Sequence, residues 1–184
     1  MILDEVFRHF DNICKQNGVL KIETVGKTYM ACGGLKFVEE RLSDDLKKLS
    51  NVKRTLDLAI GMMKFIDTFT YDAGKSLEIK IGIHHGNCIF GVLGYHKPQF
   101  SLIGDTVNTT SRCCTTGPNG KVILSEQAYQ ALAKNQELDE GVYKFLEKIV
   151  EMKGKGDKKT YVLQRDESIN KKYRRSTIGA TNQD

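Results

Sequence analysis

The chain of 184 residues has a hydrophobic content of 40% and a charged content of 28%, which suits one globular domain with a packed core and is too short to indicate two. The formal net charge of +5 is modest, and the basic residues are scattered among acidic ones without an aromatic stripe, so we expect no nucleic-acid partner. No apolar run approaches the roughly 20 residues that cross a bilayer, and the first residues do not resemble a signal peptide. We therefore expect no direct membrane insertion of this segment.

The cysteines indicate a reducing compartment. Their number is odd, two of them are adjacent, and their spacing does not match a metal site, so a disulfide framework is not expected. A cytoplasmic location follows as the expectation. The five cysteines are Cys14, Cys32, Cys88, Cys113 and Cys114.

The first part of the chain predicts a helix followed by a hairpin. Apolar residues recur at helical spacing from Ile2 to Cys14, and Asn17-Gly18 ends this pattern. Residues 19–25 alternate and are rich in β-branched side chains, and Gly26-Lys27 turns the chain into a second strand at 28–32.

The middle of the chain predicts a long helix and a second hairpin. Residues 37–49 are highly charged, with no clear pattern, and a helix with one apolar face follows at 51–69. Strands at 77–83 and 88–93 flank His85-Gly86-Asn87, so we expect them to pair. Residues 94–100 are expected to form a loop.

The last part alternates short helices and strands. Asp105 and Thr106 are suited to cap a helix at 106–114, and Ser125 is suited to begin another at 125–134. The expected strands lie at 121–124, 142–152 and 160–163. Because helices and hairpins mix without regular βαβ alternation, we predict an α+β fold with a mainly antiparallel sheet. We expect one domain over residues 1–164 and a flexible polar tail over 165–184.

Four segments together resemble the catalytic domain of class III nucleotidyl cyclases. They are KIETVGKTYMACGG at 21–34, IKIGIHHG at 79–86, FSLIGDTVNTTSR at 100–112 and MKGKGDKKTYVL at 152–163. The resemblance implies a ferredoxin-like sheet with helices packed on it, of which the family's opening strand is missing here. It also implies a dimer of two such domains, with the active site in the cleft between them.

The resemblance implies that this chain does not supply the metal-binding half of the active site. In the family, one half supplies two aspartates that bind a pair of divalent cations. The first belongs to the strand that is missing, and Lys27 stands where the second is expected. Because an ammonium group repels a hard cation, we expect this chain alone to bind no metal, and Mg²⁺ or Mn²⁺ to be supplied through the partner domain.

The complementary, nucleotide-binding set is complete. Asn108 and Arg112 are four residues apart on an expected helix, so they share one face. The resemblance implies that Asn108 orients the ribose, that Arg112 stabilises charge on the α-phosphate, and that Lys153 holds the terminal phosphates. The alternatives are a helix cap for Asn108 and a surface cation for Arg112, while Lys155, Lys158 or Lys159 could take the place of Lys153.

Glu23 and Ser101 match the family positions that contact the base. A carboxylate accepts from both N1–H and the amino group of guanine but repels the N1 acceptor of adenine, so Glu23 favours GTP. A hydroxyl donates or accepts, so Ser101 decides less. The alternative for Glu23 is an exposed strand residue beside Lys21.

Two further features are expected to be structural. His84 and His85 face opposite sides of a strand, so a shared metal site is not expected and one of the two should be packed. Asp105 is expected to cap the helix that follows it.

The sequence therefore predicts the metal-free half of a heterodimeric guanylyl cyclase, which converts GTP to cyclic GMP and pyrophosphate. The partner domain, on the same or another polypeptide, would carry the metal-binding aspartates. The pattern resembles protist guanylyl cyclases, in which paired domains belong to membrane proteins, so we expect the cytosolic domain of a membrane-anchored protein. Two alternatives stay open: an adenylyl cyclase half-domain, and a catalytically inactive regulatory module.

Overall fold

The computed structural model describes residues 2–96, 98–139 and 141–164. The predicted flexible tail at 165–184 lies outside these residues.

The first three elements follow the predicted order. Helix α1 (Ile2–Gln16) turns its buried residues Val6, Phe10 and Cys14 toward the rest of the molecule. Strands β1 (Leu20–Val25) and β2 (Thr28–Cys32) form the expected antiparallel hairpin, with an irregular register between Lys21 and Glu23.

The charged segment after β2 folds into two short helices, α2 (Lys36–Glu39) and α3 (Asp44–Lys47), which the sequence did not predict. The long helix α4 (Asn51–Thr68) confirms the apolar stripe, and the Ser50 hydroxyl caps it by accepting from the Lys53 amide. None of the helices in the described residues is long and apolar enough to span a membrane.

The predicted second hairpin is wrong in its pairing. After the small hairpin of β3 (Thr70–Tyr71) and β4 (Lys75–Ser76), strand β5 (Ile81–Ile83) pairs in parallel with β8 and not with β6. Strand β6 (Ile89–Leu93) pairs instead with β7 (Gln99–Ile103), part of which was expected to be loop. Alternating apolar residues mark a strand without specifying its neighbour, so a local hairpin was the wrong choice.

The remaining elements are α5 (Asp105–Thr116), β8 (Val122–Ser125), α6 (Glu126–Lys134), β9 (Lys144–Met152) and β10 (Gly156–Gln164). The largest sheet has the strand order β5-β8-β10-β9, in which only the β5–β8 pair is parallel. This confirms the α+β fold with mainly antiparallel strands. Within the described residues, no strand joins the separate β1–β2 hairpin to this sheet.

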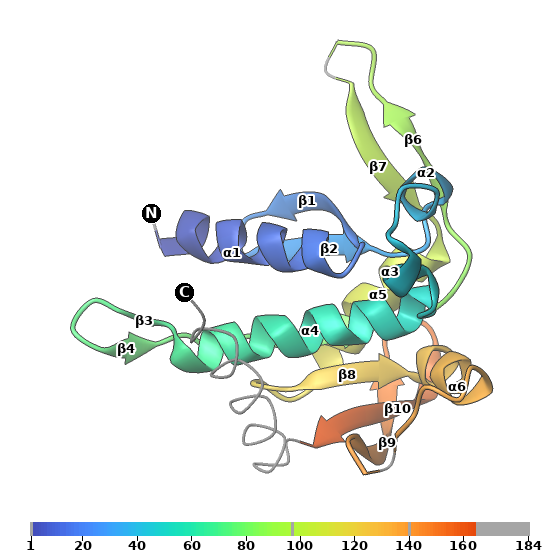
Figure 1. Ribbon diagram of the computed structural model, residues 1–184. Coiled ribbons are helices and arrows are strands. Elements are labelled where there is room, and N and C mark those ends of the chain that lie inside the picture. The colour runs from blue at the N-terminus through green and yellow to red at the C-terminus, as the bar shows by residue number, and fades with distance from the viewer. Residues whose placement is uncertain (1, 97, 140, 165–184) are drawn as a thin grey trace, which may run out of the picture.

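Helix α4 lies between two apolar clusters and holds the fold together (Figure 1). One face contributes Leu56 and Met63 to the cluster that covers the four-stranded sheet and α6. The other contributes Leu58 and Met62 to the cluster formed with α1 and β2. The β6–β7 hairpin projects away from this body beside α2.

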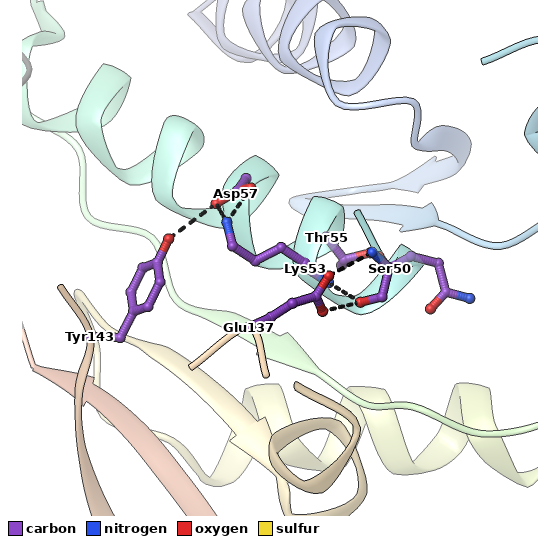
Figure 2. A network of polar contacts seen from close by, with 7 residues as sticks. Ser50, Lys53, Thr55, Asp57, Glu137 and Tyr143 are labelled. Carbon is purple, nitrogen blue, oxygen red and sulfur yellow. Dashed lines mark hydrogen bonds and ion pairs between the residues drawn. The ribbon is translucent and has the colours of Figure 1, made fainter. Parts of the chain in front are cut away.

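Polar contacts fix the first half of α4 against the segment that precedes β9 (Figure 2). The Glu137 carboxylate accepts from the Ser50 amide at 2.7 Å and from the Ser50 hydroxyl. Lys53 pairs with Asp57 at 2.5 Å, and the Tyr143 hydroxyl donates to Asp57 at 3.4 Å. The contacts of Glu137 with Ser50 and of Tyr143 with Asp57 join segments that are far apart in the sequence.

Candidate functional site

Glu23 lies where the β1–β2 hairpin meets strand β7. The Gln99 amide donates to the Glu23 carboxylate over 3.2 Å, which ties the end of one hairpin to the other. Glu23 is half-buried, so its side chain is partly accessible to solvent. It therefore keeps acceptor capacity for a further donor.

Strand alternation places Ser101 on the same face of β7 as Gln99. The intervening Phe100 belongs to the opposite face, where its ring contacts Phe37 and Phe90 at centroid distances of 6.2 and 6.0 Å. The structure thus puts the hydroxyl of Ser101 on the side of β7 from which Gln99 reaches Glu23. Sequence reasoning missed Gln99, although its position two residues before Ser101 could have revealed it.

Lys21 does not neutralise Glu23. Its ammonium group pairs with Asp11 of α1 at 3.0 Å and lies over the ring of Tyr29, 5.4 Å from the centroid. The irregular register between Lys21 and Glu23 separates the two side chains. Lys21 and Glu23 therefore have different partners, Asp11 for the first and Gln99 for the second.

Asn108 and Arg112 lie on α5, which follows β7 after a single glycine. Their neighbours Thr109 and Cys113 are buried, whereas Asn108 is exposed and Arg112 is half-buried. Helix α5 packs directly on β5, where a side chain at Gly82 would come within 2.4 Å of the helix backbone. The helix is thus held rigidly while Asn108 remains open to a ligand.

Asp105 has a different role from the predicted cap. Gly104 takes the capping position of α5, with a φ of 138°, and makes no side-chain cap bond. The Asp105 carboxylate instead pairs with Lys155 at 2.5 Å, and this hydrogen bond holds the pKa of Asp105 below its ordinary value. The ion pair brings the β9–β10 turn to the first turn of α5.

Lys153 lies in that same turn and is exposed. Its neighbours Gly154 and Gly156 have φ values of 72° and 66°, a backbone conformation that glycine adopts without strain. Of the other lysines that could replace it, Lys155 is engaged by Asp105 and Lys159 pairs with Glu147 at 3.3 Å. The geometry therefore leaves Lys153 better placed for a ligand than either of these two.

Lys27 lies at the exposed turn between β1 and β2. Across the described ranges, no three His, Cys, Asp or Glu side chains gather in a group that could hold a metal ion. An ammonium group offers a divalent cation no lone pair. The residues present do not fit the metal pair that the resemblance implies for the other half of such a site.

His84 is packed, and His85 is exposed. The Nδ1 atom of His84 lies 2.8 Å from the Ser125 hydroxyl, which in turn caps α6 by accepting from the Ala128 amide. Burial, followed by the proximity of His85, lowers the pKa of His84. This pair supports the fold at the carboxyl end of β5.

The candidate site thus has two parts joined by β7 and Gly104. The Glu23 carboxylate and the Gln99 amide meet where β1 meets β7, with Ser101 on the same face of β7 as Gln99, and these three groups can read the edge of a base. An amide, a guanidinium and an ammonium group lie along α5 and the β9–β10 turn, and they can bind hydroxyls and phosphates. Such a combination suits a nucleotide.

Comparison with known proteins gives a consistent picture. The family model described as the adenylate and guanylate cyclase catalytic domain matches residues 1–165. The germination-specific adenylate cyclase of Dictyostelium discoideum is 35% identical over 96% of this chain, and guanylate cyclase beta of Plasmodium falciparum is 35% identical over 88%. The chain spans only 20% and 5% of the length of these two proteins.

A solved structure shares the fold. The guanylate cyclase domain of RhGC from Catenaria anguillulae, in complex with GTP, superposes with a TM-score of 0.73 and 31% identity. The match covers 90% of this chain and 82% of that one.

Proposed function

The chain belongs to the family of adenylate and guanylate cyclase catalytic domains, and we propose that it is the nucleotide-binding, metal-free half of a guanylyl cyclase. In this proposal it converts GTP to cyclic GMP and pyrophosphate together with a complementary cyclase domain. The partner belongs to the same or another polypeptide.

The observation that carries the guanine preference is the contact between Glu23 and Gln99. Because Gln99 donates to only one carboxylate oxygen, the other can accept from guanine, whose N1–H and amino group are adjacent donors. The same carboxylate facing adenine would meet an acceptor, at a cost of about 1–3 kcal/mol. Ser101 would donate to the guanine O6.

The chain's other residues act on the ribose and the phosphates. The exposed Asn108 orients the ribose, and Arg112 stabilises negative charge that develops on the α-phosphate as the 3′-oxygen attacks. Lys153 holds the terminal phosphates as a point charge on the β9–β10 turn. The Asp105–Lys155 ion pair supports this arrangement because it fixes the turn against α5.

The cations belong to the partner in this proposal. Lys27, which stands where the family's second metal-binding aspartate is expected, supports a division in which Mg²⁺ or Mn²⁺ is held by aspartates of the other domain. The projecting β6–β7 hairpin also supports pairing, since Ile89, Val92 and Tyr95 are 73%, 67% and 94% exposed.

The test is Arg112→Ala in the chain reconstituted with a cyclase domain that carries both metal-binding aspartates. We expect cyclic GMP formation to fall roughly 100- to 1000-fold, the usual effect of removing one group that stabilises transition-state charge. Lys134→Ala removes a cation from α6, away from the site, and serves as the matched control with unchanged turnover. Unchanged turnover in Arg112→Ala would favour the regulatory module instead.

An adenylyl cyclase half-domain is the second candidate, because Ser101 can accept from the amino group of adenine as well as donate to guanine. Product formation from GTP and from ATP in the same reconstituted pair separates the two functions. A kcat/KM that is higher for ATP would replace the guanylyl proposal.

The proposal extends to location, with this segment on the cytosolic side of a membrane-anchored protein. Fractionation of the full-length gene product, followed by protease protection of this segment, tests that placement. Recovery in a soluble fraction, or on the protected lumenal side, would contradict it.

A further inference from the structure

The β6–β7 hairpin has one aromatic face and one open face. Strand alternation puts Phe90 of β6 and Phe100 of β7 on the same face, where their ring centroids lie 6.0 Å apart. The opposite face carries Gln99 and Ser101, and the residue paired with Ser101 across the hairpin is Gly91. Apart from the neighbours of Gly91 in the chain, no atom of the described residues lies within 4 Å of the position that a Cβ would take there, so a ligand has room beside Ser101.

A third ring joins the aromatic face of the hairpin to helix α2, which lies beside it (Figure 1). The ring of Phe37 lies 6.0 Å from that of Phe90 and 6.2 Å from that of Phe100, edge-on to the latter. The three rings therefore contact one another and form one aromatic cluster. Phe37 is 36% exposed and Phe90 is 44% exposed, so this cluster lies at the surface and outside the two apolar clusters of the core.

Helix α2 is itself fixed to the core. Leu35, the residue before it, is 3% exposed. Glu39, its last residue, pairs with the buried Arg54 of α4 and accepts from the Gly34 amide. Phe37 thus projects from a segment that the core holds at both ends, and its ring contacts hold β6 and β7 against that segment.

The aromatic cluster holds β7 more firmly than the polar contact on the other face does. There the Gln99 amide donates to the Glu23 carboxylate over 3.2 Å, at an exposed position. A hydrogen bond that water can replace contributes little to the placement of a strand. The ring contacts also remove apolar surface from water, which adds to their own attraction. The orientation that the rings impose on β7 is therefore what brings Gln99 to Glu23.

We propose that Phe37 is a positioning residue for base recognition. Its ring fixes the orientation of β7, which keeps Gln99 on Glu23 and keeps Ser101 on the face that the base approaches. This inference rests on the proposed function, because that function assigns Glu23 and Ser101 to the base. Phe37 does not touch the nucleotide and acts only through β7.

This role predicts a particular change in the kinetic constants. The base takes no part in making or breaking bonds, so its contacts stabilise the bound substrate and the transition state equally. Loss of base positioning therefore raises KM for GTP and leaves kcat nearly unchanged. It also weakens the distinction between guanine and adenine, because Glu23 is no longer held where only guanine offers it donors. A simple loss of folded protein would instead lower kcat for both nucleotides by the same factor.

The first experiment measures kcat and KM for GTP and for ATP, with the chain reconstituted with a cyclase domain that carries both metal-binding aspartates. In Phe37→Ala, we expect the ratio of kcat/KM for GTP to that for ATP to fall about 2- to 10-fold, the range that corresponds to the loss of one aromatic contact. The kcat for GTP should change by less than about twofold.

Two variants serve as controls for the lost ring. Phe37→Tyr keeps the aromatic contacts and should keep the native ratio. Phe69→Ala removes another half-buried ring, which lies 5.3 Å from the ring of Phe65 at the end of α4, and should leave the ratio unchanged. An unchanged ratio in Phe37→Ala would overturn the proposal.

A double substitution tests whether Phe37 acts through Glu23. In the Glu23→Gln background, the carboxylate that distinguishes the two bases is absent. Adding Phe37→Ala should then change the ratio by less than about twofold, because the two residues belong to one chain of contacts. A full effect of Phe37→Ala in that background would mean that Phe37 acts elsewhere, and it would also overturn the proposal.

Hydrogen exchange of the isolated chain tests the positioning without any substrate. Phe37→Ala should speed amide exchange in the β6–β7 hairpin and leave α1 and α6 unchanged, whereas Phe69→Ala should leave the hairpin unchanged. Unchanged exchange of the hairpin in Phe37→Ala would refute the proposal even if the kinetics changed. A native pair that forms no cyclic GMP would refute the proposed function, and the exchange measurement alone would then decide whether Phe37 holds β7.

Discussion

The buried Arg54 of α4 offers the sharpest test of how this fold is held together. Its side chain is 1% exposed, and its guanidinium group pairs with Glu39 of α2 at 2.5 Å and donates to the Gly18 carbonyl at 3.3 Å. Glu39 also accepts from the amide of Gly34, so one side chain connects α4, α2 and the turn after β2. We expect Arg54→Met to destabilise the chain because it removes the charge from this junction.

The expected loss of stability in Arg54→Met follows from how deeply Arg54 and Glu39 are buried. Removing one member of a fully buried ion pair costs about 3–5 kcal/mol, but Glu39 is 35% exposed and can be rehydrated in part. We therefore expect a loss of about 2–4 kcal/mol in the free energy of unfolding, or a midpoint about 5–15 °C lower. Thermal and urea unfolding measure it, with the exposed Arg41→Met as the matched control, which should change stability by less than about 0.5 kcal/mol.

A double-mutant cycle with Arg54→Met and Glu39→Gln separates the contribution of the ion pair to stability from that of side-chain packing. Because Arg54→Met already removes the attraction, adding Glu39→Gln should cost less than it does in the native chain, with a coupling of at least about 1 kcal/mol. Native-like or higher stability of Arg54→Met would refute the reasoning, since it would mean that apolar contacts of the methionine outweigh the buried charge.

Three further outcomes follow from the structure. Glu137→Gln should lower the free energy of unfolding by about 1–2 kcal/mol in urea titrations, because it weakens two charge-assisted bonds to the residue that caps α4; no change would refute this. The isolated chain should form no cyclic GMP above the protein-free background with Mg²⁺ or Mn²⁺, because Lys27 offers no metal ligand; robust turnover would contradict the division of labour. Since the folded chain lowers the pKa of His84, its stability should fall as the pH drops from about 7 toward 5, where the unfolded chain gains a proton first. His84→Gln should flatten that slope, and an unchanged slope would mean that other groups cause it.

Most elements could be predicted because their signals are local. The apolar periodicities of α1 and α4 and the serine cap at Ser125 depend only on neighbouring residues. The pairing of β5 with β8 could not be predicted this way, because it depends on a crossover of nearly 40 residues. The turn-like His85-Gly86-Asn87 instead suggested a local hairpin that does not form.

In the candidate site, too, local signals predicted the elements but not the contacts between distant segments. The spacing of Asn108 and Arg112 on one helix was enough to place both on α5, but no spacing linked either of them to residues 40 or more positions away. The Asp105–Lys155 ion pair and the Glu23–Gln99 bond are contacts of this long-range kind, and each fixes a segment with a predicted site residue. Asp105 was misread as a cap because the nearest helix end is the default partner for an acidic residue in that position.

These two contacts suggest how a half-site could be kept ready before its partner arrives. The Lys155 side chain is 18% exposed and pairs with the Asp105 side chain, which is 74% exposed, so the turn with Lys153 is positioned by a contact that water can still reach. Glu23 is likewise held through one carboxylate oxygen. Lys153 and Glu23 therefore remain able to bind a ligand while the β9–β10 turn and the β1–β2 hairpin that carry them are already fixed. Because these segments are ordered beforehand, less conformational entropy is lost when a ligand binds.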